Sequence, residues 1–135
     1  MNYIEYKQNV LSWRNSLIQA WAFSCVGTDS DCAYMLLSIA RKLGLTDRDD
    51  LSGGVMKTWP RKQIAPSWAC SAALVLLISN KYLPNKDEIL AAMIFYWLTD
   101  NEIQSVDDGL ENYPVYLKDE FSDQVEYWIR SYFKK

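Results

Sequence analysis

Carboxylate side chains crowd into one segment of this chain, where they could bind a cationic partner. Between Thr99 and Glu126 there are nine acids and one base, Lys118, so this acidic segment has a net charge of −8. The whole chain of 135 residues carries −3, which leaves +5 for the remainder. Focused charge of this kind can raise association rates to about 10⁸–10⁹ M⁻¹s⁻¹. The acidic segment therefore indicates binding of a basic macromolecule, and the alternative is a solvated face that maintains solubility.

Histidine-based chemistry is excluded, because the sequence contains no histidine. Ser-His-Asp triads, Cys-His pairs and His-ligated metals are ruled out with it. Adjacent acids such as Asp107-Asp108 point in different directions on a helix, which disfavours a catalytic dyad. Asp29-Ser30-Asp31 lacks the glycine and the closing glutamate of a calcium loop. We therefore predict no enzyme activity, no metal and no cofactor.

A second group of residues that could bind a ligand lies at 57–62, where three cations flank Trp59. It could present Trp59 as an anchor at a protein interface, since Trp and Arg are favoured there. It could also clamp a phosphate or stack a base. In a third interpretation, Trp59 folds back over the core. No glycine spacing typical of phosphate-binding loops accompanies this group.

The predicted binding surface combines the acidic segment with aromatic side chains, because tyrosine buries area at interfaces with few rotors to freeze. Its predicted members are Asp100, Glu102, Asp107, Asp108, Glu111, Tyr113, Tyr116, Asp119, Glu120, Asp123 and Trp59. The expected partner is one basic protein, such as a toxin domain. Direct nucleic-acid binding is not expected, because neutralising phosphates requires a basic surface and the pI is near 4.9.

Five helices and no strand are predicted to position these residues. The second is expected to start at Thr28 or Ser30 and to stop at Gly44, which follows capping and glycine rules. The segment 45–66 is expected to be a long connection with at most one helical turn, because it contains Gly53, Gly54, Pro60 and Pro66, and 99–113 is expected to be an irregular acidic stretch.

The other four helices are expected at 3–25, at 67–82, at 86–98 and from Pro114 to the end of the chain. The helix at 67–82 is apolar on nearly all sides, which indicates a buried helix. The last helix has one apolar stripe, formed by Leu117, Phe121, Val125, Trp128, Ile129 and Tyr132.

The resulting fold class is all-α, with residues 1–135 forming a single domain. We expect one compact bundle of about five helices, in which 67–82 and 86–98 form a central antiparallel hairpin. Asn85 with Glu88 matches a capping box for the second of these helices. Ser12-Trp13 recurs 55 residues later as Ser67-Trp68. This repeat supports an alternative arrangement of two stacked helical hairpins followed by a C-terminal helix.

Three cysteines bear on the expected compartment. Cys25, Cys32 and Cys70 are interpreted as small buried side chains in a reducing cytosol. The alternative is a Cys25–Cys32 bridge, which requires an oxidising compartment. No apolar run is long enough to span a bilayer, and no basic leader followed by an apolar run opens the sequence. We therefore expect a cytoplasmic protein with no membrane partner.

In composition, the chain is similar to bacterial immunity proteins and other inhibitors of toxic nucleases. The shared features are small size, acidity, helical content, abundant Tyr and Trp, and the lack of a catalytic motif. This resemblance implies a protein-binding inhibitor that neutralises a basic nuclease toxin. The alternative is a helical adaptor or oligomeric subunit without inhibitory role, and an enzyme ranks third. The oligomeric state is left open.

Overall fold

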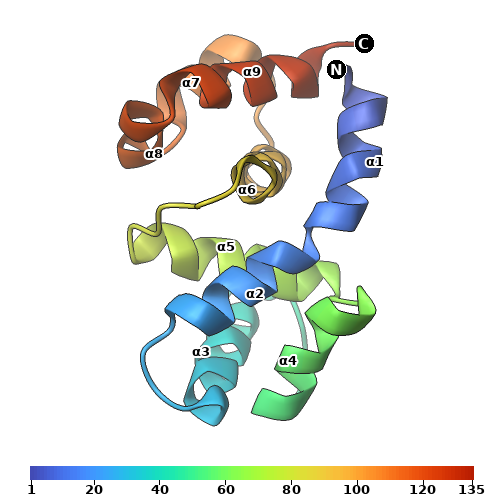
Figure 1. The fold of residues 1–135 in the computed structure, drawn as a ribbon, viewed down its shortest axis with the longest axis vertical. Helices are drawn as coiled ribbons and strands as arrows, with labels where there is room; N and C mark the ends of the chain where they lie inside the picture. Colours follow the sequence, from blue (N-terminus) through green and yellow to red (C-terminus); the bar gives the residue numbers. More distant parts are fainter. The chain divides into compact units, whose positions relative to one another are not determined.

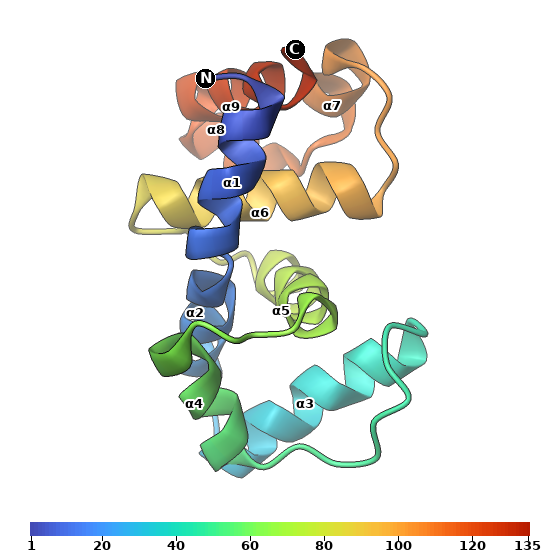
Figure 2. The ribbon, with the colours of Figure 1, turned by 90° about the vertical axis from the view of Figure 1, so that its right-hand side faces the viewer.

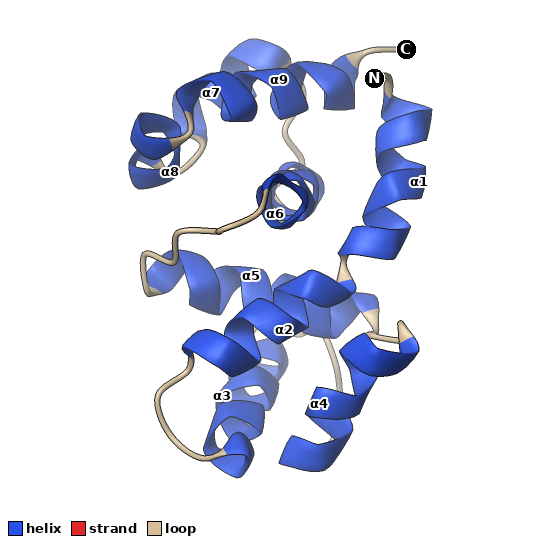
Figure 3. Cartoon of the chain, in the orientation of Figure 1, coloured by secondary structure: helices blue, strands red, loops and turns tan.

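Nine helices (Figure 1) and no strand (Figure 3) make up the computed structural model, which describes all 135 residues. The all-α class is confirmed, but the expected number of about five helices is wrong. Contacts divide the chain into two compact units. Unit 1 comprises Met1–Trp13 and Leu83–Lys135, and unit 2 comprises Arg14–Tyr82. The prediction of a single domain over residues 1–135 stays a prediction.

Unit 1 is organised around its last helix, which contacts each of the other four. The contacting helices include α1, from the start of the chain, so the two termini lie close together (Figure 1). The backbone N–H of Tyr3 donates a hydrogen bond to the carbonyl of Lys134, at 2.8 Å. The helices of unit 1 are α1 (Tyr3–Trp13), α6 (Asp87–Asp100), α7 (Val106–Asn112), α8 (Val115–Glu120) and α9 (Ser122–Phe133).

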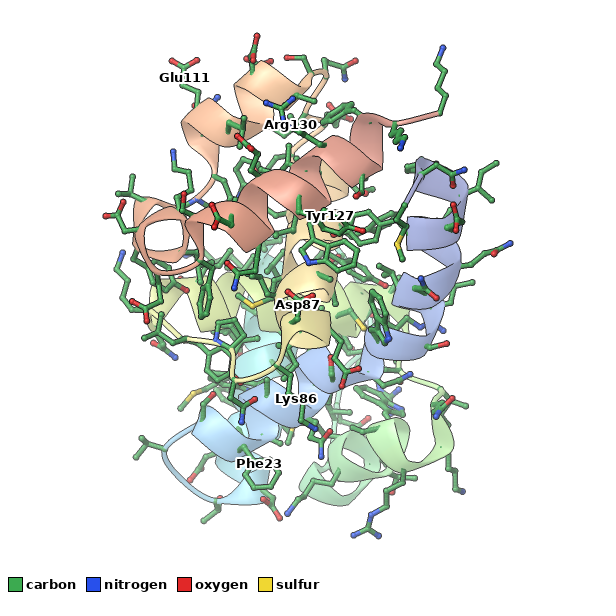
Figure 4. The ribbon with its side chains drawn as sticks, turned by 45° about the horizontal axis from the view of Figure 1, so that its top comes forward. Phe23, Lys86, Asp87, Glu111, Tyr127 and Arg130 are labelled. Carbon is green, nitrogen blue, oxygen red and sulfur yellow. A yellow bond between two sulfur atoms is a disulfide. The ribbon has the colours of Figure 1, made fainter.

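Trp128 of α9 connects three helices of unit 1. Its ring centroid lies 4.8 Å from that of Tyr6 and 5.7 Å from that of Trp13, both on α1. Its indole Nε1 donates a hydrogen bond to Oδ1 of Asp87, at 3.2 Å, where α6 faces α9 (Figure 4). Because the indole is both buried and hydrogen-bonded, it fixes α9 against α1 and α6.

Unit 2 contains α2 (Asn15–Ser24), α3 (Asp29–Lys42), α4 (Gly53–Lys62) and α5 (Ser67–Ser79). Both α4 and α5 pack on α2 and on α3. An extended connection joins α3 to α4 (Figure 2). No single helix is long and apolar enough to cross a bilayer. The helices α4 and α5 meet that requirement together, although the chain bends by 107° between them.

Local capping signals gave the boundaries of α3 correctly. The Thr28 hydroxyl accepts a hydrogen bond from the Asp31 N–H, and the Asp31 carboxylate accepts one from the Thr28 N–H, each at 3.1 Å. Hydrogen bonding of the Asp31 carboxylate, first to the Thr28 backbone N–H and then to the Thr28 side chain, lowers the pKa of Asp31. Gly44 follows the helix with φ of 72°, the left-handed conformation that glycine adopts most readily.

The first predicted helix is broken into α1 and α2 at Arg14. The Arg14 carbonyl accepts a hydrogen bond from the N–H of Leu17, only three residues on, at 3.0 Å. The thiol of Cys70 donates to the same carbonyl, at 3.5 Å. The buried side chain of Asn15 accepts a hydrogen bond from the N–H of Ala65, at 2.9 Å. Tertiary contacts therefore determine where the helix breaks, since no proline or glycine marks this position in the sequence.

The connection predicted at 45–66 was wrong, because α4 lies within it. The Ser52 hydroxyl caps this helix by accepting a hydrogen bond from the Val55 N–H, at 3.1 Å. A Cβ on Gly53 would lie 2.6 Å from the Cβ of Asp29. Glycine at this position therefore allows α4 to approach the start of α3 more closely than any other residue would.

The final predicted helix is divided into α8 and α9 at Phe121, whose φ of −127° and ψ of 44° leave the helical region. The apolar stripe predicted across this break is confirmed for four of its six members, whereas Phe121 and Tyr132 are half-buried. Leu117, Val125 and Ile129 are each almost completely buried. The stripe therefore identified the buried face correctly, although the helix is interrupted.

The predicted central hairpin is not a unit of the fold, because α5 belongs to unit 2 and α6 to unit 1. The predicted capping box of Asn85 with Glu88 was also wrong. Lys86 is the residue before α6, and no side chain caps that helix. Trp13 ends α1 whereas Trp68 lies in the first turn of α5. The repeated Ser-Trp pair therefore does not mark equivalent positions.

Two of the three cysteines are paired, which corrects the interpretation of all three as free thiols. Cys25 and Cys32 form a disulfide with a Cα–Cα distance of 6.0 Å, whereas the buried Cys70 takes no part in a disulfide. The bridge connects the end of α2 to the first turn of α3. The structure therefore matches the alternative that the sequence left open.

Candidate protein-binding surface

The charge of the chain is divided between its two units. Unit 1 contains twelve acids and six bases, a net charge of −6. Unit 2 contains five acids and eight bases, a net charge of +3. A partner that recognises charge therefore meets two surfaces of opposite sign, and the acidic one is the stronger.

A helix that the sequence prediction missed presents the centre of the acidic segment. The Ser105 hydroxyl caps α7 by accepting a hydrogen bond from the Asp108 N–H, at 3.2 Å. Asp107 and Asp108 lie in its first turn, where the helix dipole stabilises negative charge. A Cβ on Gly109 would lie 3.1 Å from a side-chain methyl of Ile129. The backbone of α7 therefore lies directly on α9, with its acids on the outside.

All the acids of the acidic segment are exposed. One of them, Glu126, forms an ion pair with Arg130, which lies just beyond the segment, and the charged atoms are 3.7 Å apart. Glu111 of α7 points away from the ribbon (Figure 4). Seven of the exposed carboxylates have no cation within 4.0 Å, so this surface keeps its charge. They are Glu102, Asp107, Asp108, Glu111, Asp119, Glu120 and Asp123.

Lys118, the single base of the acidic segment, is engaged with the backbone rather than with a carboxylate. Its ammonium donates hydrogen bonds to the carbonyl of Leu110, at 2.7 Å, and to that of Glu111, at 3.1 Å. These carbonyls lie in the last turn of α7, where a cation interacts favourably with the helix dipole. Lys118 therefore ties α8 to α7 without neutralising the acidic side chains.

Lys118→Met is expected to lower the free energy of unfolding by about 1 kcal/mol, because two charge-assisted hydrogen bonds are lost. Lys7→Met is the matched control, because Lys7 is an exposed lysine on α1. Urea denaturation followed by circular dichroism measures both changes. Equal effects of the two substitutions would show that the backbone hydrogen bonds of Lys118 contribute nothing.

The two tyrosines predicted for the surface occupy different environments. Tyr113 is 1% exposed, and its ring packs edge-on against that of Trp97 with centroids 5.1 Å apart. Burial, and then repulsion from Tyr116, raises the pKa of Tyr113 well above its ordinary value. Tyr116 is less buried, and burial raises its pKa to about 12. Tyr116 therefore remains a neutral hydrogen-bond donor at neutral pH, whereas Tyr113 belongs to the core.

Trp59 belongs to unit 2, whereas the acidic segment belongs to unit 1. Its side chain is only 6% exposed. Its ring packs edge-on against that of Trp68, with centroids 5.7 Å apart. The guanidinium of Arg48 lies 5.9 Å from the ring centroid of Trp59. This arrangement matches the interpretation in which Trp59 folds back over the core, so its side chain is not available as a surface anchor.

The sequence prediction missed a groove on unit 2 beside Phe23, whose side chain projects from the end of α2 (Figure 4). Phe23 is 84% exposed, although Trp21, two residues earlier, is buried. Residues two apart do not share a helix face, so placing Trp21 on the apolar face of the first predicted helix was a usable signal for an exposed Phe23. The groove has a volume of about 300 Å³ and is lined by Gln19, Ala22, Phe23, Lys57, Pro60 and Arg61.

No family model, curated protein or solved structure matches this chain. No three Cys, Asp or Glu side chains are arranged to hold a metal ion. The candidate surface is therefore defined by charge, exposure and packing alone, and its main chemical feature is a set of exposed carboxylates.

Proposed function

We propose that this chain is a protein-binding inhibitor, similar in action to an immunity protein, that neutralises a basic toxin of the nuclease type. The observation that supports this proposal is the set of seven exposed carboxylates without a cation within 4.0 Å. They belong to a unit with a net charge of −6. A surface of this kind attracts a basic protein over long range and orients it before contact.

The helices behind the acidic surface suit this role. Six of the seven acids lie on α7, α8 and α9. Both α7 and α8 pack on α9, which in turn packs on α6. A rigid scaffold reduces the ordering cost of binding, because few backbone groups must be fixed on association. Tyr116 adds a neutral donor among the carboxylates. Inhibition then consists of covering the cationic site through which a nuclease holds phosphates.

Affinity capture with the intact chain as bait tests this proposal. At low salt it should recover one basic protein, encoded beside the gene for this chain if the pair acts as toxin and inhibitor. We expect the dissociation constant to rise at least about tenfold when the salt concentration is increased beyond the physiological range. A partner that is acidic, or an affinity that salt does not change, would contradict the proposal.

The alternative function is a helical adaptor that binds without inhibiting. Stoichiometric addition of the chain to the purified partner separates the two. An inhibitor abolishes the nuclease activity of the partner at a one-to-one ratio, whereas an adaptor leaves that activity intact.

The cytoplasm is the compartment that we propose from the sequence, and the disulfide provides a test of it. Thiols in the cytosol are kept reduced, whereas bridges persist in oxidising compartments. Thiols can be alkylated while the native cells are lysed in denaturant, which exposes the buried Cys70, and the alkylated cysteines can be counted by mass spectrometry. Alkylation of all three cysteines supports the cytoplasm, whereas alkylation of Cys70 alone places the chain in an oxidising compartment.

A further inference from the structure

The groove on unit 2 combines two cations with an apolar wall. Lys57 and Arg61 are one helical turn apart on α4, so they share a face. The groove that they line is completed by α2, which contributes Phe23. Both cations are exposed at the surface. The groove can therefore pair with two carboxylates while an apolar side chain packs on Phe23.

The cations of the groove are available to a ligand. Arg61 has no acid within 4.0 Å. Lys57 pairs with Asp29 at 3.4 Å, but the two side chains are 51% and 57% exposed. Exposed ion pairs contribute little to stability, so a carboxylate from another molecule can replace Asp29 at small cost.

Two apolar side chains at the end of α2 and just after it are also highly exposed. Phe23 is 84% exposed and Val26, three residues later, is 89% exposed. Aromatic residues and arginine are enriched at protein interfaces, where they supply much of the binding energy. An open groove with an aromatic rim therefore fits a protein segment better than an enclosed small molecule.

A surface with the complementary pattern occurs on this same chain. In α8, Val115 is 63% exposed. Asp119 lies one helical turn after Val115, so the two side chains share a face, and Glu120 is exposed beside it. Neither acid has a cation within 4.0 Å. The face of α8 therefore offers an apolar side chain and two carboxylates, which match the apolar wall and two cations of the groove.

We propose that the groove lined by Phe23, Lys57 and Arg61 binds the exposed face of α8 from a second copy of this chain. The net charges of −6 on unit 1 and +3 on unit 2 favour such a contact between copies. Because α8 belongs to the acidic surface, self-association competes with a basic partner. The groove itself lies outside that surface, so this inference does not depend on the proposed function.

Light scattering of the intact chain over a wide range of concentrations tests this contact. At low salt the apparent mass should rise above 15.7 kDa with concentration, and high salt should reverse the rise. Reversing the charge of the groove with Lys57→Glu and Arg61→Glu should abolish association. Reversing the charge of α8 with Asp119→Lys and Glu120→Lys should also abolish association. The matched control is Arg41→Glu with Lys42→Glu on α3, which should leave association unchanged.

Mixing the two reversed variants provides the decisive result, because the acidic α8 of one variant can then meet the unchanged groove of the other. We expect association to return in the mixture, although each variant alone is monomeric. A wild-type chain that stays monomeric, or association that survives groove reversal, overturns the inference. The groove variant should still bind the basic partner, so a failure of this inference is distinguishable from a failure of the proposed function.

Discussion

Reversing three charges on α7, with Asp107→Lys, Asp108→Lys and Glu111→Lys, is expected to weaken binding of the basic partner about a hundredfold or more. Each substitution removes an attraction and adds a repulsion, and three changes of about 1 kcal/mol give that factor. The carboxylates are exposed and have no cation within 4.0 Å. Most of their electrostatic interaction is therefore available to the partner. Isothermal titration calorimetry with the purified partner measures the change.

A control with the same change in net charge distinguishes a local effect from a general one. Asp47→Lys, Asp49→Lys and Asp50→Lys alter three exposed acids of unit 2, outside the acidic segment. We expect this variant to bind within about threefold of the wild type. If both variants lose affinity equally, the partner responds to net charge and not to the surface of α7.

Lysines at the start of α7 also oppose the helix dipole, so folding of the variant must be verified. Circular dichroism provides this check. A second variant avoids the first turn of α7 altogether, with Asp119→Lys, Glu120→Lys and Asp123→Lys. This variant should bind the basic partner more weakly to a similar degree, because its three acids belong to the same set of exposed carboxylates. Wild-type affinity in both folded variants would refute the acidic-surface proposal.

The second large effect is on stability, where Trp128→Ala is expected to lower the free energy of unfolding by about 3–5 kcal/mol. Trp128 is 5% exposed. The substitution removes the ring contacts to Tyr6 and Trp13, and it also removes the hydrogen bond to Asp87. It leaves a cavity where α9 meets α1 and α6. Urea denaturation monitored by circular dichroism gives the free-energy difference.

Two milder substitutions separate the contributions of Trp128. Trp128→Phe keeps an aromatic ring but loses the hydrogen bond to Asp87, which should cost about 1–2 kcal/mol in addition to the smaller ring. Tyr127→Ala is the neighbouring control, because Tyr127 is 49% exposed although its ring also contacts Trp128. It should cost about 1 kcal/mol or less. A loss in Trp128→Ala no greater than that in Tyr127→Ala would contradict the placement of Trp128 in the core.

Elements whose signals are local could be predicted from the sequence. The boundaries of α3 followed from the expected start at Thr28 or Ser30 and the expected stop at Gly44, because caps and glycine turns depend on interactions within a few residues. The almost wholly apolar composition of α5 correctly indicated a buried helix. The apolar stripe of α9 likewise identified its buried face, because a helix repeats every 3.6 residues whatever it packs against.

Elements whose signals conflict were missed. Gly53 and Pro60 suggested a loop, yet both lie within α4. Gly53 is required there by the close approach of Asp29, which only the tertiary structure reveals. The cap of α7 was visible in principle, since Ser105 is followed three residues later by Asp108. Gly109 and the many acids of this segment indicated an irregular stretch instead, so no helix was predicted there.

The acidic part of the candidate surface was readable from the sequence, whereas its aromatic part was not. Carboxylates in water are exposed unless a cation or donor compensates their burial, so composition placed them outside correctly. Tyrosine and tryptophan occupy either environment. The burial of Tyr113 and of Trp59 depends on Trp97 and Trp68, and no spacing rule specifies these contacts.

Carboxyl footprinting of the complex most directly tests whether the acidic surface is the binding site. Carbodiimide-activated labelling, read by mass spectrometry, reports the solvent access of each acid with and without the basic partner. We expect Asp107, Asp108, Glu111, Asp119 and Glu120 to be labelled more slowly in the complex, while the acids at 47–50 keep their rates. Unchanged labelling of the acidic surface, with protection at 47–50 instead, would contradict the account.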